Sequence, residues 1–460
     1  MENLKNISPF RLSSLLRLQK NPNLALQLFQ NPNPNSSPKP FRYSFLSYNL
    51  IISKLARAKM FDEMEQILLQ MKHEIRFSPK ESLFCNIISF YGRSRSPDRA
   101  LATFDRIPTF NCYRTVRALN SLLNALLKCR NLEKIREIRS HLDRYASPDA
   151  CTYNILINAS CLSNSLDDAW NLFDEMRRKG IRPNVVTFGT LVSALCRNSM
   201  LDEAFRLKKK MMRVFHVKPN VFVYTSLIKG LCEMGELDSA FKLKDEMLLD
   251  EKVGVDAAVY SPLIIALFRT GRKGEVVSIL EEMKGNGCKP DTVTYNAIIA
   301  GFCNEKDFVS AFGVLDEMLE KGCKPDVFSY NTIIAGFCKG GRLREAIDLF
   351  EDMPRRECPP DVVSYRMIFD GLCDGMEFKE AALILDEMLF KGYAPRLLSV
   401  DKFVEGLCCE GDLELLGMVI NSLLKGNAIH VDIWKMVVNS ICVKSTKLNA
   451  FELVDRLRIQ

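Results

Sequence analysis

One short pattern returns at a nearly constant interval along most of this chain of 460 residues. Tyr295, Tyr330 and Tyr365 follow one another at intervals of 35 residues. A Lys-Pro-Asp segment or a close variant of it precedes each of these tyrosines, as in KPDTVTYN at Lys289. A period of this length is typical of repeat architectures, in which every unit contacts only its neighbours. The pattern therefore favours a stack of small units over one central core.

Each repeat carries the apolar spacing of two successive helices. In the repeat that starts at Thr292, the apolar face of the first helix comprises Tyr295, Ile298, Ile299, Phe302 and Cys303. The second helix carries Ala311, Val314, Leu315 and Met318. Gly322 predicts the end of that helix, and Asp326 predicts the N-cap of the next one. We therefore expect an all-α, right-handed α-solenoid superhelix of helix-turn-helix repeats about 35 residues long.

Small residues and thiols keep the same period when each repeat is counted from the residue after the closing residue of the preceding repeat. Glycine occupies the tenth position in several repeats, which predicts close helix–helix approach there: Gly230, Gly301, Gly336, Gly371 and Gly406. Cysteine occupies the twelfth position on the apolar face: Cys161, Cys196, Cys232, Cys303, Cys338, Cys373, Cys408 and Cys442. Thiols at such positions are expected to be buried small hydrophobes, not metal ligands or nucleophiles.

The first residues differ in composition from the repeats. No Asp or Glu occurs from Asn3 to Phe61, and Arg and Lys alternate with Leu and Ser in FRLSSLLRLQK. This composition is typical of an organelle transit peptide, and the alternative is a basic first helix of the folded body. We expect residues 1–44 to be a targeting segment and degenerate helical cap, and residues 45–460 to be the repeat array. The expected location is the mitochondrion, with the chloroplast as the alternative.

Several functional classes find no support in the sequence. No apolar run reaches the roughly 18 residues of a membrane-spanning helix, so we expect no membrane association. The four histidines, His73, His141, His216 and His430, fall at different positions of the repeat and form no metal or triad spacing. We therefore expect no enzyme, no metal and no cofactor. The formal net charge of +7 is compatible with a polyanionic partner.

The segment VTYNAIIAGFCNEKDFVSAFGVLDEMLEKGCKPD is similar to the consensus of the pentatricopeptide repeat family, and the even repeat length resembles its pure-repeat (P-type) subclass. The resemblance is strongest over residues 150–361 and readable over about 12 repeats. It implies a monomeric protein that binds single-stranded organelle RNA without catalysis, with other RNA-processing factors as further partners. The alternative is a scaffold solenoid that binds peptides, as tetratricopeptide repeats do.

The resemblance also implies which residues read RNA bases. In the family, the fifth residue and the closing residue of each repeat contact one base. The corresponding pairs are Asn120 with Asp149, Asn154 with Asn184, Gly189 with Asn220, Thr225 with Asp256, Ser261 with Asp291, Asn296 with Asp326, and Asn331 with Asp361. A carboxylate only accepts hydrogen bonds, so a closing Asp favours uracil or guanine, whereas a closing Asn suits cytosine or adenine. The alternative role of each closing residue is a helix cap.

Two further sets of residues complete the predicted interface. Apolar second residues are expected to stack on bases, or alternatively to pack between helices: Val186, Phe222, Val293, Phe328 and Val363. Basic residues at the thirteenth position are expected to meet phosphates, or alternatively to form a solvated face: Arg197, Arg269 and Lys339. No base is assigned to the terminal pairs, which depart from the family pattern: Asn49 with Lys80, Cys85 with Thr115, Arg366 with Arg396, and Asp401 with His430.

Overall fold

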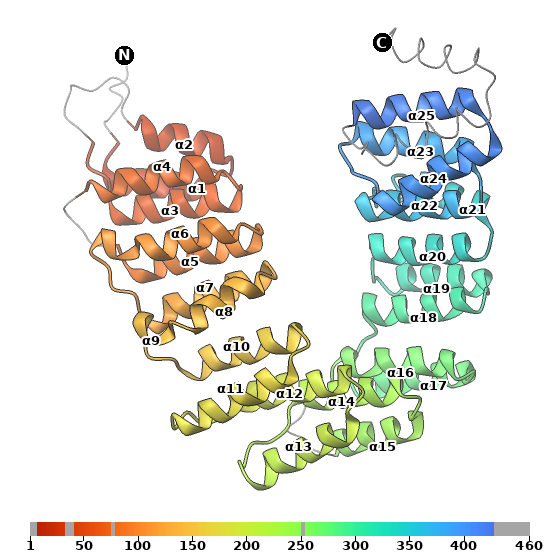
Figure 1. Cartoon of the computed structure of the whole chain (residues 1–460), viewed down its shortest axis with the longest axis horizontal. Helices are drawn as coiled ribbons and strands as arrows, with labels where there is room; N and C mark the ends of the chain where they lie inside the picture. Colours follow the sequence, from red (N-terminus) through yellow and green to blue (C-terminus); the bar gives the residue numbers. More distant parts are fainter. Residues whose placement is uncertain (1–6, 33–40, 75–78, 250–253, 427–460) are drawn as a thin grey trace. The chain divides into compact units, whose positions relative to one another are not determined.

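The computed structural model describes residues 7–32, 41–74, 79–249 and 254–426. The chain divides into two compact units, Met1–Leu227 and Ile228–Gln460. The described residues form α-helices and two short 3-10 helices, and none of them forms a β-strand (Figure 1). Within each unit the helices stack in antiparallel pairs, which confirms the predicted all-α solenoid of repeats. His430 and Cys442 lie outside the described residues.

The first unit is built almost entirely of helices that follow the expected pairs. Its elements are α1 (Pro9–Leu18), α2 (Pro22–Gln30), α3 (Phe45–Arg57), α4 (Phe61–Lys72), α5 (Glu81–Arg93), α6 (Pro97–Arg106), η1 (Ile107–Phe110), α7 (Val116–Lys128), α8 (Leu132–Arg139), α9 (Leu142–Tyr145), α10 (Ala150–Leu162), α11 (Leu166–Arg178), α12 (Val185–Arg197) and α13 (Leu201–Arg213). The boundary between the units lies inside α14 (Val221–Glu233).

The second unit repeats the same pairing with greater regularity. Its elements are α15 (Leu237–Leu248), α16 (Ala257–Arg269), η2 (Lys273–Glu275), α17 (Val276–Gly285), α18 (Thr292–Asn304), α19 (Phe308–Glu320), α20 (Val327–Lys339), α21 (Leu343–Asp352), α22 (Val362–Asp374), α23 (Phe378–Phe390), α24 (Leu397–Glu410) and α25 (Leu413–Lys425). From α18 to α23, each first helix packs against its own second helix and against the first helix of the following repeat. The first helices thus form one layer, and the second helices form the other.

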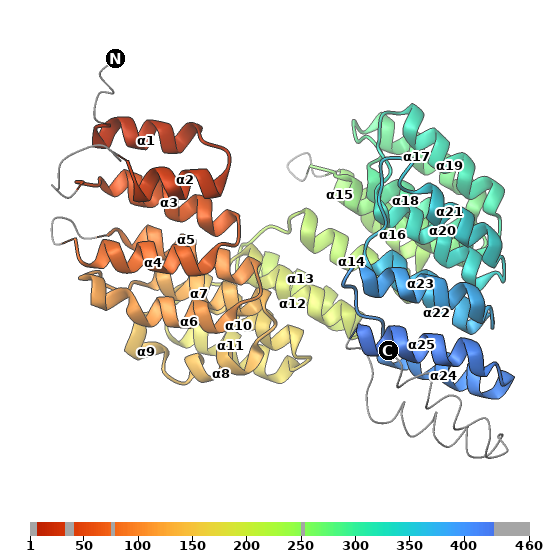
Figure 2. The ribbon, with the colours of Figure 1, turned by 90° about the horizontal axis from the view of Figure 1, so that it is seen from above.

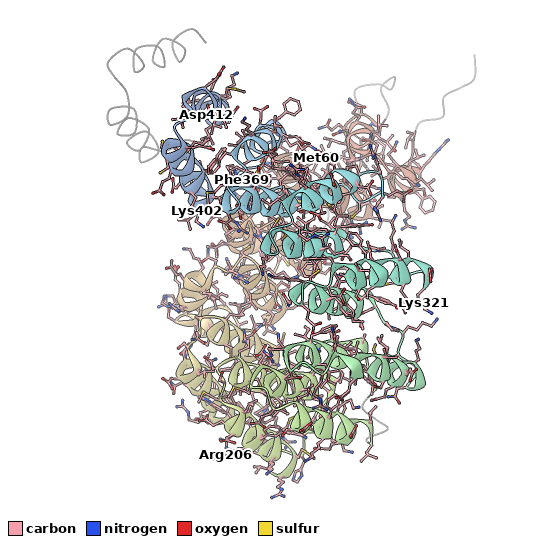
Figure 3. All side chains as sticks on the ribbon, turned by 90° about the vertical axis from the view of Figure 1, so that its right-hand side faces the viewer. Met60, Arg206, Lys321, Phe369, Lys402 and Asp412 are labelled. Atoms are coloured by element: carbon pink, nitrogen blue, oxygen red, sulfur yellow. The ribbon has the colours of Figure 1, made fainter. Side chains whose placement is uncertain are left out.

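A continuous apolar core runs through the second unit between these two layers. It extends from Ile299 in α18 to Leu423 in α25 and contains large side chains such as Phe369, which is fully buried (Figure 3). No hairpin in this stack encloses a core by itself, because its apolar face is covered by the next hairpin. The position of every first helix is therefore fixed by the repeats on both sides of it.

Close helix packing at the tenth position is confirmed in the second unit. A Cβ atom added at Gly301 would lie 2.3 Å from the Phe268 ring carbon Cγ, and one at Gly371 would lie 2.4 Å from Sγ of Cys338. Only glycine fits these contacts between successive first helices. The twelfth-position thiols are largely buried as predicted, with Cys338 half-buried. Burial raises the pKa of Cys161 to about 11, so this thiol stays protonated at neutral pH.

The described part of residues 1–44 contains a helical hairpin. Helices α1 and α2 pack on α3, with Leu12, Leu16 and Phe29 fully buried (Figures 1 and 2). Two buried hydroxyls, those of Ser13 and Ser47, lie 2.9 Å apart between α1 and α3. This hairpin occupies the place of a preceding repeat. The targeting role of this region stays a prediction.

Candidate nucleic-acid interface

The closing residues begin the first helix of each following repeat. Asp149, Asp256, Asp291, Asp326 and Asp361 are the N-caps of α10, α16, α18, α20 and α22. In all five caps the backbone N–H groups donate to the same carboxylate oxygen, Oδ1, at 2.8 to 3.1 Å. The second oxygen, Oδ2, lies outside the cap, and the residues themselves are exposed. Capping therefore occupies half of each carboxylate and leaves the other half accessible.

The fifth-position asparagines of the first unit are locked into this cap. The Nδ2 of Asn120 donates to Oδ1 of Asp149 at 3.0 Å, while its Oδ1 accepts from the hydroxyl of Thr152 at 2.7 Å. One repeat later, Asn154 donates to Asn184 at 3.2 Å and accepts from a threonine hydroxyl at 2.6 Å. The predicted reading pairs are thus in direct contact in these two repeats. Asn184 is itself the N-cap of α12 and accepts through its Oδ1.

The asparagines of the second unit are held less tightly. Asn296 donates to Asp326 at 3.4 Å. The Oδ1 atoms of Asn296 and Asn331 are buried and accept no hydrogen bond from the described residues. The hydroxyl of Ser261 donates to the Ala257 carbonyl of its own helix at 3.4 Å. The fifth-position side chains are only 5% to 9% exposed and are therefore almost fully buried: Asn120, Asn154, Ser261, Asn296 and Asn331.

Two predicted pairs differ from this arrangement. At Gly189, an added Cβ atom would lie 2.8 Å from Cδ1 of Phe222, so the phenylalanine ring fills the space of the missing side chain. The closing residue of that repeat, Asn220, accepts from the Val223 N–H at 3.2 Å. The hydroxyl of Thr225 is buried and has no hydrogen-bond partner among the described residues. Thr225 belongs to the first unit and Asp256 to the second, so the two residues are described separately.

The predicted stacking residues all project into solvent. Val186, Phe222, Val293, Phe328 and Val363 are between 45% and 65% exposed. Large apolar side chains at the second position of a helix would ordinarily be covered by a neighbour if their purpose were helix packing. Cys151, Ala258 and Leu398 occupy the same position in other repeats and are exposed as well. Each unit therefore presents a row of apolar side chains next to its closing residues.

The predicted phosphate-binding residues are exposed at the ends of first helices. Arg197 ends α12, Arg269 ends α16 and Lys339 ends α20. The guanidinium of Arg269 also donates a hydrogen bond to the backbone carbonyl of Cys232 in the preceding first helix. This hydrogen bond uses some of the guanidinium N–H groups of Arg269 for a contact inside the protein.

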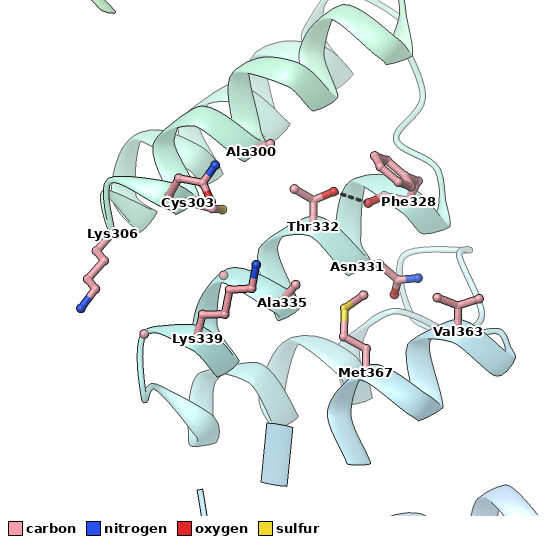
Figure 4. A pocket seen from close by; sticks show the side chains of 13 residues that line it. Ala300, Cys303, Lys306, Phe328, Asn331, Thr332, Ala335, Lys339, Val363 and Met367 are labelled. Atoms are coloured by element: carbon pink, nitrogen blue, oxygen red, sulfur yellow. Dashed lines mark hydrogen bonds between the residues drawn. The ribbon is translucent and has the colours of Figure 1, made fainter. Parts of the chain in front are cut away.

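One pocket in the second unit brings four predicted residues together. It has a volume of about 360 Å³ and is lined by residues of α18, α20 and α22 (Figure 4). The predicted base reader Asn331, the predicted stacking residues Phe328 and Val363, and the predicted phosphate contact Lys339 all line it. Met367 of α22 contributes to the same wall. A volume of this size is within the range of small-ligand sites.

The charge state of Asp149 follows from its cap. Burial by itself raises the pKa of Asp149, but hydrogen bonds from the Thr152 backbone, the Asn120 amide and the Thr152 hydroxyl outweigh it, so its pKa is lowered. Asp149 is therefore ionised at neutral pH and acts only as an acceptor.

The terminal pairs that received no base are engaged in other contacts. Arg366 donates twice to the backbone carbonyl of Ala394, at 2.7 and 2.9 Å. Arg396 pairs with Asp370 at 2.8 Å, and its side chain does not cap α24. Thr115 donates to Glu81 through its hydroxyl. These pairs do not reproduce the contact seen between Asn120 and Asp149.

Sequence reasoning missed one set of polar residues at this interface. A Thr or Ser stands at the third position of most repeats, and its hydroxyl accepts from the backbone N–H of the closing residue at Thr152, Thr187, Ser329 and Ser364. The signal was a Thr or Ser three residues after most closing Asp or Asn residues, which is the spacing of a capping box; Asn220 and Asp256 are followed by Val223 and Val259 instead. The hydroxyls of Thr152 and Thr187 also donate to the preceding fifth-position asparagine, whereas those of Ser329 and Ser364 contact only the closing Asp.

The described residues contain neither a metal-binding cluster nor a membrane-spanning helix. No group of three or more His, Cys, Asp or Glu side chains among them is arranged to hold a metal ion. None of the helices in the described ranges is long and apolar enough to cross a membrane.

Family profiles match the chain along most of its repeats. The PPR repeat family matches residues 148–197, 183–233, 290–339 and 325–374. The pentatricopeptide repeat domain matches residues 242–305, and a further PPR repeat profile matches 46–74, 222–250 and 363–393. Together these segments cover more than half of the sequence. The chain belongs to the pentatricopeptide repeat family.

Individual relatives agree with this assignment. A putative pentatricopeptide repeat-containing protein of Arabidopsis thaliana is 53% identical over 184 residues, which cover 40% of this chain and 39% of the relative. A mitochondrial pentatricopeptide repeat-containing protein of the same plant is 29% identical over 37% of this chain and 32% of its own length. The matched segments thus span less than half of these relatives. The crystal structure of the pentatricopeptide repeat protein PPR10 from maize, 22% identical, superposes with a TM-score of 0.60 over 98% of this chain and 68% of PPR10, which shows the shared fold.

Proposed function

We propose that this pentatricopeptide repeat protein binds single-stranded RNA and reads its bases one repeat at a time. The pocket beside Asn331 carries the proposal, because it combines the three kinds of group that such binding needs. A buried amide and exposed apolar side chains would meet the base, and Lys339 at the pocket wall would meet a phosphate. The repeats of each unit present the same groups at intervals of about one repeat, which suits a polymer with a regular backbone.

The order of the pairs implies a sequence for the bound RNA. Read from the N-terminal to the C-terminal repeat against RNA in the 5′ to 3′ direction, the seven pairs imply uracil, a pyrimidine, any base, guanine, guanine, uracil and uracil. The closing Asp carboxylates accept from a ring N–H, which uracil and guanine carry, and Asn184 offers an amide N–H instead. The third base is unassigned because Gly189 has no side chain and Phe222 fills its place.

The proposed biological effect follows from RNA binding alone, without any chemical reaction on the RNA. An occupied RNA segment is protected from nucleases, kept free of base pairing, or made accessible to other RNA-processing factors. We propose that the protein does this as a monomer in mitochondria, in transcript processing, stabilisation, splicing or translation. The acid-free N-terminal sequence and the mitochondrial relative support this location.

The decisive experiment is the recovery of bound RNA from the purified full-length chain after ultraviolet cross-linking. We expect enrichment of mitochondrial transcripts that contain the predicted seven-base pattern. A synthetic RNA of that pattern should bind more tightly than one with both central guanines changed to adenine. Recovery of no RNA above background, or equal affinity for the two synthetic RNAs, would contradict the proposal.

A further inference from the structure

We infer that Asp370 and Asp374 of α22 mark the 3′ end of the RNA path along the described first helices. They do so by pairing with Arg396 and Lys402, the cations that would otherwise hold the next phosphates. The inference rests on the proposed RNA binding and adds the length of RNA that the protein holds. It assigns no phosphate to these two cations, although their side chains are 61% and 68% exposed.

The ninth position of a first helix lies on the same face as the fifth, because four residues separate them. This position carries no acid from α3 to α20, where it is Ser53, Ser89, Asn124, Asn158, Ser193, Lys229, Ile265, Ala300 and Ala335. In α22 and α24 it is Asp370 and Glu405. The face that the preceding repeats use for the predicted reading residues therefore becomes acidic at these two helices.

The thirteenth position changes in the same direction. Arg269 and Lys339 stand there in α16 and α20, and Asp374 stands there in α22. Glu233 of α14 is also an acid at this position, but it pairs at 3.8 Å with Lys229 of its own helix. The acids of α22 pair instead with cations of the next repeat. A carboxylate at a predicted phosphate position repels a phosphate, because the two charges have the same sign.

The ion pair of Asp370 is the stronger of the two. Its Oδ2 lies 2.8 Å from Nη1 of Arg396, and its side chain is only 23% exposed. Its Oδ1 is buried and accepts no hydrogen bond from the described residues. A phosphate that displaced this carboxylate from Arg396 would leave a partly buried charge without a partner, which is costly. Arg396 is therefore held by the protein and is not available to RNA.

The other two cations of this face are also in use. Nζ of Lys402 lies 3.2 Å from Oδ1 of Asp374, and this pair is exposed. Arg366 occupies the fifth position, and its Nε and Nη2 donate to the Ala394 carbonyl at 2.9 and 2.7 Å. The guanidinium thus stands where α18 and α20 carry an asparagine amide, and its N–H groups contact the loop before α24. Neither a base reader nor a phosphate contact remains on α22 beyond the predicted stacking residue Val363.

The first helices near the other end of the chain have no such acids. Ser53 and Ser89 occupy the ninth position of α3 and α5. Arg57 and Arg93 occupy the thirteenth position and are exposed. Arg93 contacts the Phe90 ring and the Ser89 carbonyl of its own helix. Nucleotides added at the 5′ end of the RNA would therefore meet arginines, whereas nucleotides added at the 3′ end would meet carboxylates.

The test compares three RNAs on the full-length wild-type chain: the seven-base pattern, the same RNA with three uridines added at its 3′ end, and the same RNA with three uridines added at its 5′ end. The 3′ extension should leave the Kd unchanged within about twofold. The 5′ extension should lower the Kd by about fivefold for each new phosphate contact at about 0.1 M salt. A 3′ extension that tightens binding as much as the 5′ extension would overturn the inference.

Asp370→Asn combined with Asp374→Asn keeps the shape of both side chains and removes their charges. The double variant should gain affinity for the 3′-extended RNA over the seven-base RNA, by about fivefold for each cation that reaches a phosphate. The salt slope of log K should steepen by about 0.7 for each such contact. The further substitution of Arg396→Ala should remove most of this gain. A folded double variant that treats the two RNAs alike would show that the acids do not set the boundary.

Asp316→Asn with Glu320→Gln is the matched control, because both residues are exposed on the second helix α19. This pair changes the net charge by the same amount and should create no preference for the 3′-extended RNA. An equal gain in the control would assign the effect to net charge and refute the inference. If the double variant at Asp370 and Asp374 does not fold, the wild-type comparison of the two extensions decides. If the wild-type chain binds none of these RNAs, the proposed function itself fails.

Discussion

The substitution Asp326→Asn separates the two roles of a closing residue. Oδ1 of Asp326 accepts from the Ser329 N–H at 2.9 Å, from the Ser329 hydroxyl at 3.0 Å and from Asn296 at 3.4 Å. Oδ2 accepts no hydrogen bond from the described residues. Asparagine can keep all three contacts through its own Oδ1, and it then presents an N–H where Asp326 presents an acceptor. Asn184 already stands in this orientation in the first unit.

The expected cost in folding is small. Asn and Asp are nearly equal as N-caps, so the cap itself is preserved. The loss of a negative charge at the helix N-terminus costs about 0.3–1 kcal/mol for an exposed residue. The effect on RNA should be larger, because the ring N–H of uracil loses its acceptor while cytosine gains a donor. We expect the preference at this base to move from uracil to cytosine by about 1–3 kcal/mol, roughly 5- to 150-fold.

The assay is competition binding with two RNAs that differ only at the base assigned to Asn296 and Asp326. Asp307→Asn is the matched control, since Asp307 caps the second helix α19 and accepts from the Ser310 N–H at 3.1 Å. Asp307→Asn should lose at least as much stability as Asp326→Asn, because Oδ2 of Asp307 also accepts from the Ser310 hydroxyl at 2.7 Å, and only Asp326→Asn should change the base. A loss of stability in Asp326→Asn with an unchanged preference for uracil would show that Asp326 is a cap alone.

Four further predictions concern other parts of the chain. Gly189→Asn should destabilise the fold, because its Cβ atom meets the ring of Phe222. The additional substitution Phe222→Val should relieve this clash. In competition binding, the double variant should prefer cytosine by about tenfold at this base. Lys339→Ala should weaken all RNAs alike and reduce the salt slope of log K by about 0.7; a loss confined to one sequence would contradict a phosphate contact. A reporter fused to residues 1–40 should enter mitochondria, and a diffuse cytosolic signal would reject the targeting role. The fold lowers the pKa of Asp149, so the ionised carboxylate stabilises the protein at neutral pH. This stabilisation is lost as the pH falls through the lowered pKa. Asp149→Asn should therefore make the melting temperature less dependent on acidic pH.

The sequence predicted the features that depend on one repeat alone. The spacing of apolar residues placed the helix pairs, and the Asp or Asn before each first helix predicted the caps that Asp326 and Asp361 form. The glycine at position 371 predicted close packing because a missing side chain matters only where two helices meet. Such features are local, so the same few residue types produce them each time.

The remaining features depend on contacts between repeats that spacing does not determine. The burial of Asn296 and Asn331 follows from how closely the neighbouring first helices approach. The seating of the Phe222 ring against Gly189 requires a side-chain orientation that no pattern specifies. The hydrogen bond from Arg269 to the Cys232 carbonyl likewise joins residues 37 positions apart. Each of these contacts changes what the interface can bind without changing the repeat itself.

The shared use of one carboxylate for folding and for reading limits which residues a repeat can use. Lys80 and Arg396 occupy the closing position in degenerate repeats, and neither side chain caps the helix that follows. A closing residue must be short, must accept from backbone N–H groups and must still reach outward, which leaves mainly Asp, Asn, Ser and Thr. Few residue types are therefore possible at this position, because helix stability limits them even in the absence of RNA. A single substitution at a closing residue would therefore change both the base that the repeat reads and the stability of the helix that follows.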